Sequence, residues 1–134
     1  MKRRNTDVII WAEFFESLVE KIRSYELDCN ANQVGEYEVK DAEKFIIYST
    51  KSKKVYQFDD LEKIIGIDYR TQEMREIIKK IFGTKKCEYG VKYAEAIQCM
   101  AEICHQYEVQ DSWKENGRAR FIAYCHFHIK LREE

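Results

Sequence analysis

The sequence predicts an α+β fold, built as one domain over residues 1–134. Hydrophobic residues repeat at helical spacing near the N-terminus, and short segments between residues 36 and 58 alternate apolar with polar side chains. Helical spacing returns from residue 59, and a second alternation covers residues 118–131. Strands and helices in separate stretches of the chain indicate an antiparallel sheet with helices packed on it.

The composition is that of a globular protein with balanced charge. Hydrophobic residues make up 45% of the 134 residues, and 23 basic residues nearly cancel 24 acidic ones. The chain therefore lacks the basic excess that duplex-DNA binders show. No apolar run reaches the ~18 residues of a membrane span, and the N-terminus lacks a signal-peptide cleavage site, so we expect a cytoplasmic protein with no membrane contact.

The use of cysteine and proline adds two expectations. The five cysteines are scattered without a Cys-x-x-Cys pair, which indicates reduced thiols and not a disulfide framework. The chain has no proline and is rich in Lys, Glu, Ile and Tyr, which is a composition typical of low-GC bacteria and their phages.

Residues 7–26 form the first predicted helix, with Asp7 as the N-cap. Its helical repeat consists of Val8, Trp11, Phe15, Leu18, Val19 and Ile22. Ile10 and Phe14 widen this apolar face beyond the ~100° that one contact surface needs. Two interpretations stay open: the helix is wedged between a sheet and other helices of its own domain, or Trp11, Phe14 and Ile10 form a partner interface, for example in a homodimer.

A meander of three short antiparallel strands is predicted next, after a turn-rich stretch over residues 28–35. The strands are expected at residues 36–40, 44–50 and 54–58. The connections between them are three residues long, which suits hairpins.

Three helices follow, over residues 59–66, 71–82 and 92–107. Asp59 is the expected cap of the first, with Glu62 in the reciprocal position of a capping box. Gly66 suits the end of that helix.

The C-terminal residues 118–131 are predicted to form a strand that joins the meander, after a turn at Asn116-Gly117. The odd-numbered residues are apolar or small and would face the core, because successive side chains of a strand point to opposite sides. The other face would present a cationic and aromatic row of Arg118, Arg120, Tyr124, His126, His128 and Lys130.

This row predicts a binding surface for an anion. Arginine forks match phosphate and carboxylate geometry, tyrosine offers a stacking plane, and histidines gain charge as the pH falls toward ~6. We therefore expect a small non-enzymatic protein that binds a nucleotide, a single-stranded nucleic acid or an acidic protein surface, without a cofactor. The phage-like composition suggests, as one case, an inhibitor of a host defence or nucleic-acid enzyme.

Two other functions are considered. Residues 61–71 resemble the turn of a helix-turn-helix, which would make the protein a DNA-binding regulator. The resemblance implies a groove-facing set of Tyr69, Arg70, Gln72, Glu73 and Arg75. A small hydrolase or phosphoesterase would use His126 or His128 as general base. A metal site is not expected, because these two histidines lack a third ligand nearby.

Overall fold

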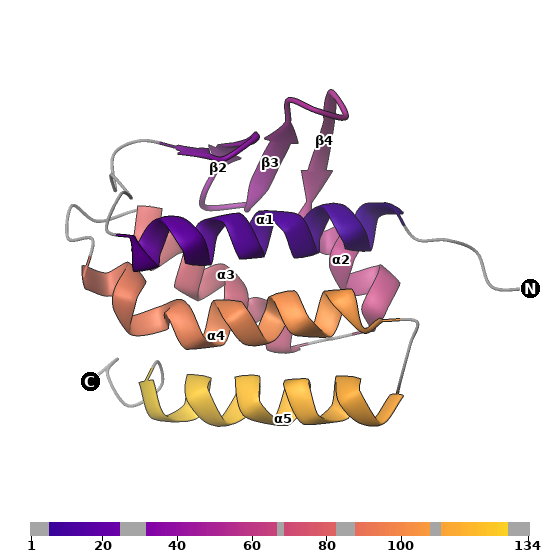
Figure 1. Ribbon diagram of the computed structural model, residues 1–134, viewed down its shortest axis with the longest axis vertical. Coiled ribbons are helices and arrows are strands. Elements are labelled where there is room, and N and C mark those ends of the chain that lie inside the picture. Colours follow the sequence, from indigo (N-terminus) through magenta and orange to yellow (C-terminus); the bar gives the residue numbers. More distant parts are fainter. Residues whose placement is uncertain (1–5, 25–31, 67–68, 83–87, 108–110, 129–134) are drawn as a thin grey trace, which may run out of the picture.

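The computed structural model describes residues 6–24, 32–66, 69–82, 88–107 and 111–128 (Figure 1). Its elements are α1 Thr6–Arg23, β1 Gln33–Val34, β2 Tyr37–Asp41, β3 Ile46–Ser49, β4 Lys54–Gln57, α2 Phe58–Ile65, α3 Tyr69–Phe82, α4 Glu88–His105 and α5 Asp111–His128. The predicted α+β class and the N-terminal helix are confirmed. Among the described residues, no helix combines the length and hydrophobicity needed to cross a bilayer.

The sheet is an antiparallel meander in the order β1-β2-β3-β4. Its register pairs Val39 with Ile47 and Ile47 with Tyr56, which aligns three buried side chains on one face. The three predicted strands are therefore confirmed. Sequence analysis missed β1, which reaches β2 through Gly35 at a φ of +59°, a conformation that glycine adopts without strain.

Helix α1 lies between the sheet on one side and α4 on the other (Figure 1). This position explains its wide apolar face. Trp11 and Phe14 are 0% exposed and Ile10 is 8% exposed, because the protein's own elements cover them. The interpretation of a wedged helix is confirmed, and the predicted partner interface through these three residues is wrong for this fold.

Helices α2 and α3 form a hairpin that side chains hold together. Gly66 ends α2 at a φ of +65° and donates its N–H to the Glu62 carbonyl at 2.9 Å, as predicted. The predicted start at Asp59 is wrong, because α2 begins earlier, at Phe58. Arg75 of α3 pairs with Asp59, and its guanidinium lies 5.5 Å from the centroid of the Phe58 ring.

The C-terminal segment corrects the sequence analysis. Residues 111–128 form helix α5, which packs on α4, so the predicted strand at 118–131 is wrong over its described part (Figure 1). The buried residues of α5 are four apart, namely Gly117, Phe121 and Cys125. Ala119 and Ala123, which a strand would have buried beside them, are exposed.

Gly117 lies where α5 packs against α4. A Cβ atom at this position would lie 2.8 Å from Cγ1 of Ile103 on α4 and 3.2 Å from Cζ3 of Trp113. The glycine therefore lets the backbones of α4 and α5 approach closely. Asn116-Gly117 was predicted to be a turn, and the structure instead places both residues inside α5.

Candidate binding surfaces

Arg118 of the predicted anion-binding row has a structural role. Its guanidinium Nη2 donates to the Ile65 carbonyl at 3.0 Å, and Nη1 lies 3.4 Å from Glu115. The Ile65 carbonyl belongs to the last turn of α2, where carbonyls lack partners within the helix and a cation is favourable. Arg118 thus joins α5 to the C-terminal end of α2.

Arg120 points along the surface of α4. Its Nη1 donates to Glu102 at 2.8 Å, and its Nη2 lies 3.5 Å from Glu95. Two carboxylates therefore neutralise this guanidinium. The prediction that Arg118 and Arg120 project together from one strand face is overturned, because both contact groups within the protein.

The different surroundings of the two arginines predict different stability effects. Arg118→Met is expected to lower the free energy of unfolding by about 1–3 kcal/mol, because it removes the side-chain donor to the carbonyl of the buried Ile65. Arg120→Met is the matched control and is expected to cost about 0–1 kcal/mol, since its ion pairs are largely exposed. Urea denaturation followed by circular dichroism measures both. Equal losses would contradict the structural role of Arg118.

Of the remaining residues of the row, only the side chain of Tyr124 is described. Tyr124 lines a small pocket of 290 Å³ between α1, α4 and α5. His126 and His128 belong to α5, but their side chains are outside what the structure describes, and Lys130 lies outside the described residues. The role of these three in binding stays a prediction.

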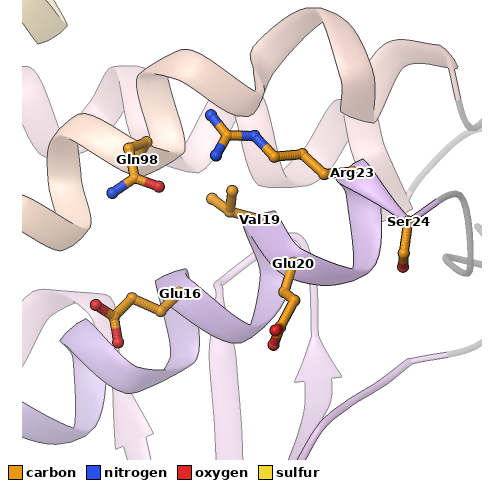
Figure 2. A pocket seen from close by; sticks show the side chains of 6 residues that line it. All are labelled: Glu16, Val19, Glu20, Arg23, Ser24 and Gln98. Atoms are coloured by element: carbon orange, nitrogen blue, oxygen red, sulfur yellow. The ribbon is translucent and has the colours of Figure 1, made fainter.

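A larger groove of 580 Å³ runs between α1 and α4 (Figure 2). Its lining consists of Glu16, Val19, Glu20, Arg23, Ser24 and Gln98. Glu16 Oε2 accepts a 2.7 Å hydrogen bond from Nε2 of His105, which links the two helices. Arg23 also lines the adjoining Tyr124 pocket, where Glu95 is a further wall. The carboxylates around Arg23 make this face unfavourable for an anion.

The buried thiols lack the features of nucleophiles. Burial raises the pKa of Cys99 to about 11 and raises the pKa of Cys104 above its ordinary value. A thiolate is the reactive form, and both sites disfavour it at neutral pH. Among the described residues, no three His, Cys, Asp or Glu side chains gather as a metal site would need.

The resemblance to a helix-turn-helix implies five groove-facing residues, and two of them are not available for DNA in this fold. Glu73 is only 8% exposed, and Arg75 is engaged with Asp59 and Phe58. Gln72 is exposed, whereas the side chains of Tyr69 and Arg70 are outside what the structure describes. Thr71 donates to Glu62 and so ties the two helices at the turn.

A cationic surface lies elsewhere, at the hairpin between β3 and β4. We define the hairpin surface as Tyr48, Lys51, Lys53, Lys54 and Val55. The three lysines are exposed, and within the described part of the chain none of them pairs with a carboxylate. Val55 is 60% exposed, the largest exposure of any large hydrophobic side chain described. Tyr48 and Val55 are cross-strand partners on the sheet face opposite to the core.

Hydrogen bonds hold the tip of this hairpin in one shape. The Lys53 N–H donates to the Ser49 carbonyl at 2.7 Å, and the Ser52 N–H donates to Ser49 Oγ at 3.1 Å. Ser52 Oγ also lies 3.1 Å from the Tyr56 hydroxyl. The lysines are thus attached to an ordered backbone, which lowers the entropy cost of binding.

Sequence analysis treated this stretch only as a connection between strands. The signal was present, because residues 51–54 carry three lysines and no acidic residue. Its position near the partly exposed ring of Tyr48 required the strand register. Comparison with known proteins adds no assignment, since no protein family, curated protein or solved structure matches the chain.

Proposed function

We propose that this protein is a small non-enzymatic binding protein and that an anionic partner docks on the hairpin surface. The observation that carries the proposal is the set of three exposed lysines, unpaired among the described residues, at the hairpin that also carries the partly exposed Tyr48 and the exposed Val55. Unpaired ammonium groups attract a polyanion without first breaking an internal ion pair. The exposed apolar groups add contact area that is lost to water in the free protein.

Three of the described arginines support this location over the C-terminal one. Arg75, Arg118 and Arg120 each contact a carboxylate of the protein itself. An anionic partner would have to replace these contacts. The lysines of the hairpin surface carry no such cost.

A pair of charge-matched variants tests the location. Lys51→Gln, Lys53→Gln and Lys54→Gln together remove three positive charges from the hairpin surface. Arg120→Gln, Lys130→Gln and Arg132→Gln remove three from the C-terminal segment and leave the structural contact of Arg118 in place. Binding to two fluorescein-labelled probes, an oligothymidylate and a poly-glutamate peptide, is measured by anisotropy over a range of salt concentrations.

The hairpin variant is expected to bind the better probe at least about tenfold more weakly. For an oligonucleotide, losing three phosphate contacts flattens the slope of log affinity against log salt by about 2. The C-terminal variant is expected to retain affinity. Loss of affinity only in the C-terminal variant would return the site to that segment, and binding of neither probe by the unaltered protein would refute the proposed function.

A further inference from the structure

We infer that the anionic partner is a single-stranded nucleic acid and that Tyr48 stacks on one of its bases. The inference rests on the proposed function and specifies the partner of the same surface. It combines the position of Tyr48 in the sheet, the use of lysine without arginine around it, and the charge of the whole chain.

Tyr48 occupies the position that base stacking requires. It lies in β3 with Glu38 opposite on β2 and Val55 opposite on β4, so its ring belongs to the outer sheet face. Among the described elements, the helices lie on the other side of the sheet (Figure 1). An aromatic ring on an exposed sheet face is a sequence-tolerant platform for an unpaired base. The exposed Val55 extends the apolar platform next to it.

Lys40 supplies a further cation at this platform. Its Nζ lies 5.6 Å from the centroid of the Tyr48 ring and 3.0 Å from Glu38. Both groups are exposed, so this ion pair is weak and the long side chain is able to move aside. A base that stacks on Tyr48 would place its phosphates near the ammonium group of Lys40.

The type of cation favours phosphate over protein carboxylates. The hairpin surface contains lysine and no arginine, whereas protein interfaces are enriched in arginine and depleted in lysine. Lysine acts as a compact point charge that suits a phosphate backbone without fixed geometry. Lys51 follows Tyr48 by three residues, about 10 Å along an extended chain, and Lys54 pairs with Ser49, the residue next to Tyr48.

A single strand is favoured over a duplex. The chain has a net charge of −1, and the cations of the hairpin surface are confined to one turn. Duplex DNA binders distribute cations over a wider surface, and a paired base offers no free face to Tyr48. We therefore expect a short footprint, on the order of 4 nucleotides.

The test measures anisotropy of labelled oligothymidylate, the same length of duplex DNA, and a poly-glutamate peptide of equal charge. Tyr48→Leu keeps an apolar side chain but removes the stacking plane, and Tyr48→Phe keeps that plane without the hydroxyl. Tyr124→Leu, on α5, is the matched control. Tyr48→Leu is expected to weaken oligothymidylate binding about tenfold, while Tyr48→Phe and Tyr124→Leu retain affinity.

The outcomes separate this inference from the proposed function. Poly-glutamate bound more tightly than oligothymidylate, with no effect of Tyr48→Leu, would overturn the nucleic-acid inference and leave an acidic protein as the partner. Duplex bound as tightly as single strand would overturn the stacking role. No binding of any of the three probes would overturn both proposals.

Discussion

Replacing Trp11 by alanine is expected to lower the free energy of unfolding by about 3–5 kcal/mol, the range for removing a large buried aromatic side chain. Its ring centroid lies 5.1 Å from that of Phe45 and 5.4 Å from that of Phe58, at the junction of α1, α2 and the sheet. The substitution would leave a cavity lined by rings that cannot close it. Urea denaturation at several protein concentrations measures the loss.

Two control variants show whether the loss in Trp11→Ala comes from the missing ring contacts. Trp11→Phe is expected to cost less, because it keeps most ring contacts and removes an indole N–H that has no hydrogen-bond partner in its buried position. Ile9→Ala, on the partly exposed side of α1, is expected to cost about 1 kcal/mol or less. A small loss for Trp11→Ala, accompanied by a change in molecular mass, would instead indicate that Trp11 belongs to a dimer interface.

Replacing Gly117 by alanine is expected to destabilise the protein by about 1–3 kcal/mol, because the new Cβ atom overpacks the contact between α5 and α4. Helix propensity alone predicts the opposite, a gain of about 1 kcal/mol. The sign of the change therefore distinguishes a close helix contact from a free helix surface. Thermal and urea unfolding followed by circular dichroism report it.

The neighbouring residue and a double mutant provide the controls. Asn116→Ala, at an exposed position of the same helix, is expected to be neutral or slightly stabilising. In an Ile103→Ala background the clashing Cγ1 atom is absent, so Gly117→Ala is expected to lose most of its cost. Destabilisation that persists unchanged in this background would contradict the proposed contact.

Local sequence patterns were sufficient to predict the elements of the N-terminal half of the fold. They also predicted that α1, α2, α3 and α4 exist. Neighbouring residues alone determine three features: the apolar face of α1, the alternation of apolar and polar residues in β2 to β4, and the end of α2 at Gly66. Element boundaries differ by up to four residues from the predicted ones, as at the start of α4. Such ends depend on capping contacts that the pattern alone does not specify.

The sequence of the C-terminal segment is compatible with the period of a strand and with the period of a helix. Phe121 and Cys125 fit both an alternating strand and a helix with residues four apart. The contact of Gly117 with Ile103 favours the helix, and a residue distant in the sequence provides it. The row of cations was inferred from the wrong period, and its described arginines, Arg118 and Arg120, contact different parts of the protein.

Sequence analysis did not identify the hairpin surface as a candidate site, again because the relevant contacts are not local. Three lysines in a four-residue stretch are ordinary for an exposed turn. Only the register between β3 and β4 pairs Tyr48 with Val55 on a sheet face that the described helices leave uncovered, next to the turn that carries the lysines.

The sequence by itself determined the α+β class, the antiparallel meander and the broad burial of α1, because these follow from side-chain periods within single segments. The tertiary structure decided that residues 111–128 are helical, that Arg118 and Arg120 serve contacts within the protein, and that unpaired cations gather at the β3–β4 hairpin. The physical reason is that ion pairing and close helix packing depend on residues far apart in the chain, which a local pattern does not bring together.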